Sequence, residues 1–207
     1  MRINHNKSKL LVTTYLLLVT VFIGCAKREI RNIDSKGKEI ICFGDSITFG
    51  YGVNPGEDYP TELSRLLGKP AVNKGVDGDT TTMALQRIRP DVLDRDPYLV
   101  IVEFGGNDFL KKVPQEETAR NLREMVDRIQ AKGAMVALVD ISAGMFFAEY
   151  RKLTKRIAKE KGCVFIPRIL SGIITNPSMK SDFFHPNVLG YKIVAERILR
   201  GIKPYLK

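Results

Sequence analysis

Short apolar runs alternate with longer amphipathic segments along the chain, from residue 39 to its end. The apolar runs, each of strand length, lie at 39–44, 71–73, 98–105, 134–141 and 163–167. Helical spacing of apolar residues marks 59–68, 81–95 with a break near Pro90, 114–133, 147–162 and 187–202. This alternation predicts βαβ units, and hence an α/β fold: a three-layer α/β/α sandwich around a five-stranded parallel sheet. Ligands bind such sheets outside the carboxyl ends of the strands, where the chemistry is therefore expected.

The first 24 residues depart from this pattern and are typical of a signal peptide. Basic residues without any acid precede an uncharged apolar stretch that ends at Gly24. That stretch is short for a membrane-spanning helix, which needs about 20 apolar residues. It closes with FIGC, which resembles a bacterial lipobox and so implies cleavage before Cys25 and lipidation of the Cys25 sulfur. An uncleaved anchor helix is the alternative, and either interpretation places the chain at a membrane of the bacterial cell envelope, facing the periplasm or the exterior.

The rest of the chain divides into a polar tether, residues 25–38, and one domain, residues 39–207. With 27% charged and 44% hydrophobic residues, the composition is that of a soluble globular protein with a single core. The formal charge of +10 falls to +7 without the first 24 residues, because Arg2, Lys7 and Lys9 are lost. Acidic residues are interspersed among the remaining basic ones, which argues against nucleic-acid binding. We expect a monomer.

Two cysteines lie in the domain, Cys42 in EIICFG and Cys163 in GCVFIP. Each lies in an apolar run, which predicts a buried position. Whether they pair is open, because an oxidising compartment permits a disulfide. The chain has no CxxC and no Cys/His spacing typical of a metal site.

Three polar motifs follow predicted strands. In GDSITFGYG, Ser46 lies in a Gly-flanked turn that exposes its hydroxyl, although the motif alone favours a cap on the next helix. In NKGVDGDT, Gly75 and Gly78 permit close backbone approach, or the segment is a loop before a Thr-capped helix. In FGGNDF, the Asn107 amide can donate to an oxyanion, or the motif is a turn capped by Asp108.

A fourth motif, SDFFHP, holds the only histidine besides His5. Asp182 and His185 are close enough in sequence for a single turn to bring the carboxylate to the imidazole. A carboxylate that accepts the Nδ1–H fixes the tautomer and leaves Nε2 free as a base. A surface histidine beside a helix start is the alternative interpretation.

Together, and in this order, the four motifs resemble the blocks of the SGNH (GDSL-type) hydrolase family. The matches are GDSITFGYG for the first block, Asn73, Gly75, Gly78 and Thr80 for Asn-x-Gly-x-x-Gly-x-Thr, 105–108 for Gly-x-Asn-Asp, and 182–186 for Asp-x-x-His-Pro. The segments YGVNPGEDYPTELSRLLG and AVNKGVDGDTTTMALQRI are most similar to the bacterial thioesterase/lysophospholipase/arylesterase branch. The resemblance implies a flavodoxin-like SGNH hydrolase fold.

The resemblance also implies a role for each matched residue. Ser46 is the expected nucleophile, His185 its base, and Asp182 the carboxylate that orients the imidazole. The expected oxyanion hole combines the backbone N–H groups of Ser46 and Gly78 with the side-chain amide of Asn107. The implied reaction is acyl transfer to water through an acyl-enzyme, without a metal or an organic cofactor.

Loops after the third and fourth strands are expected to contact the substrate. The candidates for an apolar acyl site are Phe109, Leu110, Met145 and Phe146. Phe147 fits packing against the next helix at least as well. Four further residues are expected to organise or pack their own loops: Asp45, Asp108, Phe183 and Phe184.

We therefore predict a serine esterase that hydrolyses a small acyl-ester or lipid substrate. The candidate substrates of this carboxylic ester hydrolase are acyl esters, thioesters and lysophospholipids. A carbohydrate O-deacetylase that acts on cell-surface sugars is the first alternative. A non-catalytic surface binding module is the second, but it requires a degenerate motif set, whereas every matched position is intact.

Overall fold

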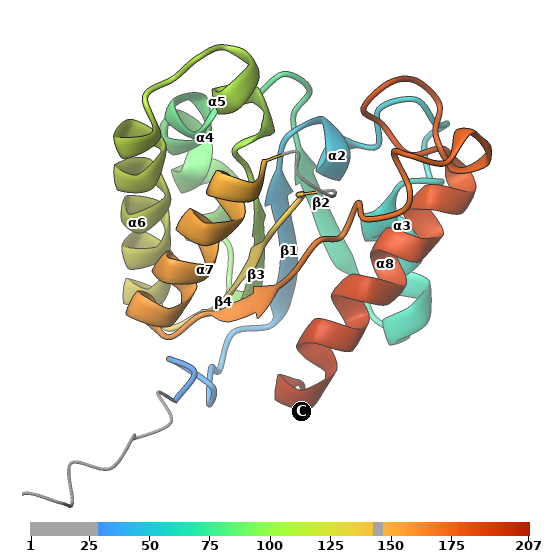
Figure 1. Cartoon of the computed structure of the whole chain (residues 1–207). Helices are drawn as coiled ribbons and strands as arrows, with labels where there is room; N and C mark the ends of the chain where they lie inside the picture. The colour runs from blue at the N-terminus through green and yellow to red at the C-terminus, as the bar shows by residue number, and fades with distance from the viewer. Residues whose placement is uncertain (1–28, 143–146) are drawn as a thin grey trace, which may run out of the picture.

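The computed structural model describes residues 29–142 and 147–207 and confirms the predicted parallel sheet (Figure 1). Its strands are β1 (Glu39–Gly44), β2 (Ala71–Gly75), β3 (Pro97–Glu103), β4 (Met135–Val139) and β5 (Val164–Ile166). They pair in parallel in the order β2-β1-β3-β4-β5. This is the flavodoxin-like order, which reverses between β1 and β3 and so opens a crevice at their carboxyl ends.

Helices cover both faces of the sheet and complete the three layers (Figure 1). One face is covered by α2 (Ser46–Phe49), α3 (Tyr59–Leu67) and α8 (Val188–Ile202). The other is covered by α4 (Thr81–Ile88), α6 (Gln115–Ala131) and α7 (Ala148–Lys161). Shorter turns connect them: η2 (Arg89–Leu93), α5 (Gly106–Leu110), η3 (Pro177–Met179) and η4 (Lys203–Tyr205).

The predicted elements match the observed ones closely. The break predicted near Pro90 is confirmed: α4 ends at Ile88 and continues as a single π-helical turn, because Pro90 has no N–H to donate. Two short helices, α2 and α5, stand where the sequence predicts only turns. Both lie directly after a strand, at the edge of the sheet where the chemistry is expected.

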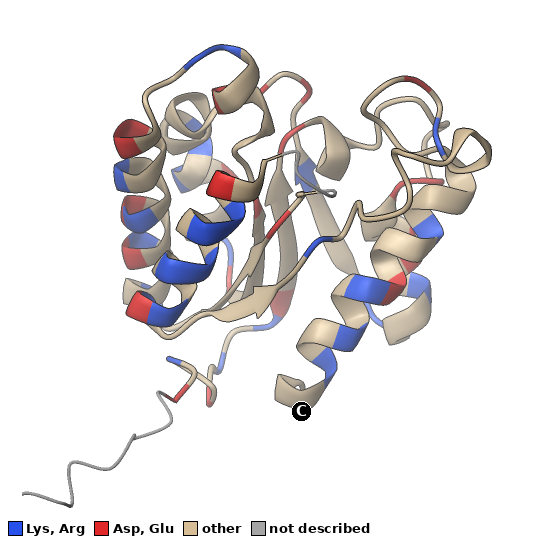
Figure 2. Cartoon of the chain, viewed as in Figure 1, with Lys and Arg blue, Asp and Glu red and all other residues tan. Residues whose placement is uncertain are grey.

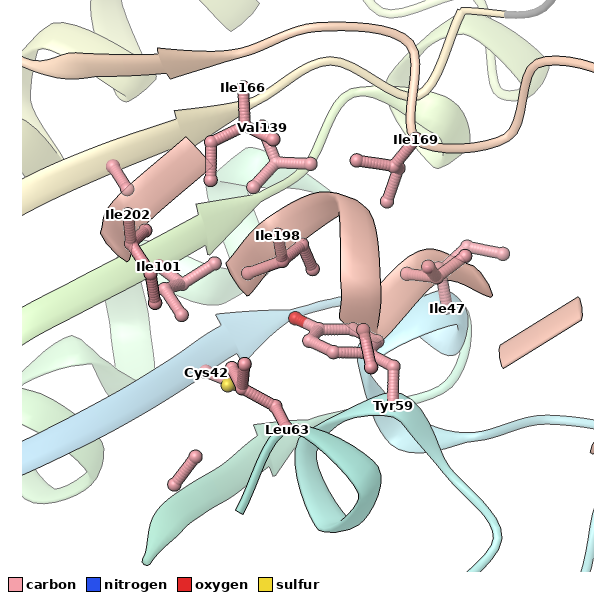
Figure 3. Close-up of a cluster of buried hydrophobic side chains, with 14 of the residues drawn as sticks. Cys42, Ile47, Tyr59, Leu63, Ile101, Val139, Ile166, Ile169, Ile198 and Ile202 are labelled. Atoms are coloured by element: carbon pink, nitrogen blue, oxygen red, sulfur yellow. The ribbon is translucent and has the colours of Figure 1, made fainter. Parts of the chain in front are cut away.

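Alternate residues of each central strand enter opposite cores, because successive side chains of a strand point to opposite faces. Cys42 packs with Tyr59, Leu63 and Ile198 on the α3/α8 face (Figure 3). Cys163 belongs to the cluster on the α4/α6/α7 face. The two thiols are therefore on opposite sides of the sheet, and both are unpaired and buried.

Charged residues of both signs are interspersed along α6 and α7 (Figure 2). Two ion pairs join these helices: Arg123 with Glu160 at 3.1 Å, and Lys161 with Asp127 at 2.8 Å. Exposed pairs of this kind each contribute less than about 1 kcal/mol to stability. The apolar contacts beneath them therefore account for most of the packing between α6 and α7.

The chain enters the domain at the amino edge of the sheet. The Arg31 N–H donates to the Gly162 carbonyl at 2.8 Å, and the Asn32 amide donates to the carbonyls of Gln130 and Ala134 at 2.9 and 3.0 Å. Residues 29–38 of the predicted tether therefore lie against the domain (blue in Figure 1). The predicted signal peptide and Cys25 lie outside the described residues. Within the described ranges, no helix is long and apolar enough to cross a membrane.

Candidate active site

Ser46 is the first residue of α2, in a tight turn at the carboxyl end of β1. The Asp45 carboxylate caps this helix by accepting the Ile47 N–H at 3.1 Å. Gly44 lets the helix fold back against the strand, because a Cβ there would lie 2.0 Å from the Thr48 hydroxyl oxygen. Neighbouring residues thus have different roles in this turn: Asp45 caps the helix and Ser46 presents its hydroxyl.

The loop before α8 brings His185 and Asp182 to this serine. The Ser46 Oγ lies 3.0 Å from the His185 Nε2, and the His185 Nδ1 lies 2.7 Å from the nearer Asp182 carboxylate oxygen. Asp182 also accepts the backbone N–H groups of Phe184 and His185, at 2.8 and 2.9 Å, which closes the loop into one turn. A proton on Nδ1, facing the carboxylate, leaves Nε2 free to accept the serine proton.

The surroundings of Asp182 favour its charged form. Partial burial raises the pKa of its carboxyl, but the hydrogen bonds from His185 and the Phe184 N–H outweigh burial, so the net pKa lies below the usual range. The carboxylate is therefore available to stabilise an imidazolium. Tyr51 packs against the imidazole, with ring centroids 4.5 Å apart, and helps to fix its plane.

Asn107 lies in the first turn of α5, and its side chain reaches the turn that carries Ser46. Its amide donates to the Asp45 carboxylate at 3.3 Å, and both Ser46 and Asn107 line one cavity. The start of α5 requires glycine at position 105, whose φ of +119° is strained for any L side chain. Gly78 also has a positive φ, +75°, but its neighbour Asp77 is the residue that lines the cavity.

The other residues of the second motif, NKGVDGDT, position the backbone around the Ser46 turn. A Cβ on Gly75 would lie 2.0 Å from the Phe49 nitrogen, so only glycine lets the end of β2 pass this close to α2. Asn73 accepts the Gly75 N–H at 2.9 Å and donates to Asp58 at 3.3 Å. Thr80 caps α4, as its position before that helix predicts. This motif therefore supports the turn that carries Ser46 from the side of β2.

Asp108 organises its loop but does not cap α5, whose first residue follows Gly105 without a side-chain cap. Its buried carboxylate accepts the Thr81 N–H at 2.9 Å and the Thr118 hydroxyl at 3.1 Å. These bonds tie α5 to α4 and α6. The alternative that Asp108 caps a Gly-Gly-Asn turn is wrong.

A cavity of about 110 Å³ opens beside Ser46, and most of its lining is apolar. The apolar residues that line it are Ile47, Leu110, Ile141, Phe147, Leu170, Ile174 and Phe184. Leu110 was predicted to contact substrate and lies here. Phe109 does not line the cavity; it is half exposed and packs against Phe147, with ring centroids 4.9 Å apart. Met145 and Phe146 lie outside the described residues.

Phe183 and Phe184 do not pack beneath their loop, so that expectation is wrong. Phe183 is 66% exposed and Phe184 is 37% exposed. A second small cavity, of about 40 Å³, lies between these rings and Ile174. Phe147, Ile174 and Phe184 line both cavities, which places the two side by side.

Sequence reasoning missed Ile141, Leu170 and Ile174. Ile141 lies within the predicted fourth strand, whose end carries it to the cavity. Leu170 and Ile174 belong to the irregular connection after β5, where no periodic pattern points to a site. Among the described residues, no group of three or more His, Cys, Asp or Glu side chains is placed to hold a metal ion.

The chain is similar to known proteins in sequence and fold. A model of the GDSL-like Lipase/Acylhydrolase family matches residues 42–193, a range that contains all four motifs. The Esterase TesA of Pseudomonas aeruginosa is 24% identical over 194 residues, which cover 88% of this chain and 96% of that protein. An Arylesterase of Vibrio mimicus is 29% identical over 185 residues, with coverage of 82% and 90%. The crystal structure of AlinE4, an SGNH-hydrolase family esterase, has a TM-score of 0.63 at 30% identity, with coverage of 82% and 94%.

Proposed function

The chain belongs to the GDSL-like Lipase/Acylhydrolase family and is a carboxylic ester hydrolase, and on this premise we propose that it works as a serine esterase through an acyl-enzyme on Ser46. The observation that carries the proposal is the continuous line of hydrogen-bonding groups from Ser46 through His185 to Asp182. A serine hydroxyl is a poor nucleophile unless an adjacent base takes its proton. Here the base and the carboxylate that orients it are both within hydrogen-bonding distance.

In the proposed reaction the Ser46 Oγ attacks the ester carbonyl while the His185 Nε2 accepts its proton. Asp182 stabilises the imidazolium that forms. The oxyanion accepts hydrogen bonds from the Ser46 and Gly78 backbone N–H groups and the Asn107 amide, each worth about 3 kcal/mol in the transition state. The imidazolium then protonates the leaving alcohol or thiol, and water, activated by the same imidazole, releases the acid.

Replacing Asn107 with alanine is expected to lower kcat by about 10²- to 10³-fold. In the proposed mechanism the amide stabilises negative charge that develops only in the transition state, so KM should change little. Steady-state kinetics on p-nitrophenyl butyrate measure both constants. Asn121→Ala removes a comparable amide that does not line the cavity and donates to the Thr81 and Thr82 hydroxyls at 3.1 and 2.9 Å, and it serves as the control. A tenfold rise in KM with unchanged kcat would contradict the proposed role.

The apolar cavity supports acyl chains longer than acetyl as the substrates. Each buried methylene contributes about 0.8 kcal/mol, or roughly fourfold in binding. We therefore expect kcat/KM to rise from p-nitrophenyl acetate through butyrate to hexanoate. Ile174→Trp should fill the junction of the two cavities and reverse this order, so that acetate becomes the best substrate.

Leu66→Trp is the matched control, because Leu66 is 41% exposed on α3 and does not line the cavity. It should leave the chain-length profile unchanged. A strict preference for acetyl esters in the unmodified protein would contradict the acyl-chain proposal and favour carbohydrate O-deacetylation.

A further inference from the structure

Glu103, the last residue of β3, is an acidic side chain in an apolar position. Every residue of β3 is buried, and Glu103 is fully buried at 0% exposure. Strand alternation points it to the face occupied by Leu99 and Ile101, beneath α2. Burial of a carboxyl group is costly unless it is hydrogen-bonded, so its contacts need an explanation.

Glu103 holds the turn that carries Ser46 through two hydrogen bonds. Its Oε2 accepts the Thr48 hydroxyl at 2.8 Å and lies 3.4 Å from the Asp45 N–H that donates to it. These bonds reach both ends of the turn that carries Ser46. The space for them exists because residue 44 is glycine: a Cβ there would lie 2.7 Å from the same Glu103 oxygen.

Asp45 extends this contact to the oxyanion side of the site. The Asp45 backbone N–H donates to Glu103, and the Asp45 carboxylate makes two further contacts. One Asp45 oxygen accepts the Ile47 N–H at 3.1 Å, and the other accepts the Asn107 amide at 3.3 Å. A chain of hydrogen bonds therefore runs from Glu103 through Asp45 to Asn107.

Two adjacent carboxyl groups without a cation cannot both be charged in a buried site. Among the described residues, neither Glu103 nor Asp45 forms an ion pair with Lys, Arg or His, which favours a proton on Glu103, the more deeply buried of the two. The Glu103 Oε1 has no hydrogen-bond partner in the described part of the chain, which a neutral acid tolerates better than a carboxylate.

The charges around the pair agree with this assignment. Burial, and then the neighbouring Asp45, raise the pKa of Glu103 well above its usual value. Burial raises the pKa of Asp45 to about 6, opposed mainly by the hydrogen bond that its carboxylate accepts from the Ile47 N–H. The other titratable groups that face the pair are Asp108 near Asp45, and Tyr59 and Tyr191 near Glu103.

We propose that Glu103 is a positioning residue that acts as a neutral acid: it bridges Thr48 and Asp45, and through Asp45 it sets the direction of the Asn107 amide. The inference rests on the proposed function, because it assigns Glu103 to the support of Ser46 and Asn107. Glu103 itself touches neither the substrate nor the reacting atoms.

The protonation of Glu103 can be measured without catalysis. A glutamate in the unfolded chain ionises near its ordinary value of 4.5, whereas folded Glu103 keeps its proton above that pH. Between pH 4.5 and the raised pKa of folded Glu103, the folded state binds more protons than the unfolded state. The unmodified protein therefore loses the stability that Glu103 contributes as pH rises, and Glu103→Gln does not. From pH 5 to pH 8, the ratio of the unfolding constant of the unmodified protein to that of Glu103→Gln should rise by up to tenfold per pH unit.

Urea unfolding at pH 5, 6, 7 and 8 gives this ratio, with Glu116→Gln on the surface of α6 as control for the loss of one carboxylate. A flat or falling ratio shows that Glu103 is charged in the fold and overturns the proposal. This outcome is distinct from failure of the proposed function, which an active Ser46→Ala would reveal while leaving the unfolding result intact.

Kinetics test the positioning role. Glu103→Gln keeps a neutral side chain whose oxygen can accept from the Thr48 hydroxyl and the Asp45 N–H, so its kcat should stay within about threefold of the unmodified value. Glu103→Ala should lower kcat at least tenfold with little change in KM, and should cost less in an Asn107→Ala background, since the two act in one chain. Equal costs in both backgrounds, or a Gln variant as impaired as the Ala variant, overturn the proposal. If Glu103→Ala does not fold, the Gln kinetics and the unfolding ratio still decide.

Discussion

Ser46→Ala is expected to lower kcat by roughly 10⁴- to 10⁶-fold. The Ser46 Oγ forms the covalent bond in the proposed mechanism, and alanine offers no atom to replace it. The change should leave the fold intact, because the hydroxyl makes one described hydrogen-bond contact, with the His185 Nε2. Turnover of p-nitrophenyl butyrate gives the loss, and thermal unfolding shows whether the variant is folded.

Covalent labelling by a fluorophosphonate probe tests whether Ser46 is the nucleophile. The unmodified protein should be labelled covalently, and Ser46→Ala should not. Ser171→Ala, a serine in the connection after β5 that does not line the cavity, is the matched control and should be labelled normally. Labelling of Ser46→Ala would place the nucleophile elsewhere, and a complete lack of labelling in the unmodified protein would favour a binding module.

His185→Ala is expected to cost nearly as much, roughly 10⁴- to 10⁶-fold in kcat. His185 is the only histidine in the described part of the chain, so no second imidazole there can accept the Ser46 proton. The rate of fluorophosphonate labelling should fall with kcat, because labelling also requires an activated hydroxyl. Both rates are measured on the same preparation.

The double variant Ser46→Ala/His185→Ala should be no slower than either single variant. Residues that act in one proton transfer lose their function together, and their effects do not add. Tyr51→Leu, which removes only the ring packed on the imidazole, should have a much smaller effect. Additive losses in the double variant would show that the two residues act independently.

The fold could be predicted because a sheet covered on both faces imposes a simple pattern. Each buried strand is an apolar run, and the helices between the strands carry one apolar stripe. The site residues could be placed because parallel strands end at one edge, so motifs far apart in sequence meet there. Ser46 and Asn107 follow neighbouring strands, β1 and β3, and the structure brings both to one cavity.

The short helices and the cavity wall could not be predicted for a physical reason. Helix α2 has four residues and α5 has five, too few to show an amphipathic period. Leu170, Ile174 and Phe184 come from an irregular connection, whose path depends on tertiary contacts. Glu103 did leave a signal: it is the one charged residue in the apolar run YLVIVEFG, and a buried charge in a strand calls for a partner.

The contacts of Arg31 and Asn32 fix where the chain enters the domain. They fasten the entering chain at the amino edge of the sheet, while Ser46 lies at the carboxyl edge, about 20 Å away along β1. We propose from the lipobox-like FIGC that a lipid on Cys25 anchors the chain, and only residues 26–28 then separate it from Glu29. With the anchor near the amino edge of the sheet, we propose that the cavity at the carboxyl edge faces away from the bilayer. The enzyme would then meet esters that arrive from the aqueous side or from an opposing surface, rather than lipids of the leaflet that carries it.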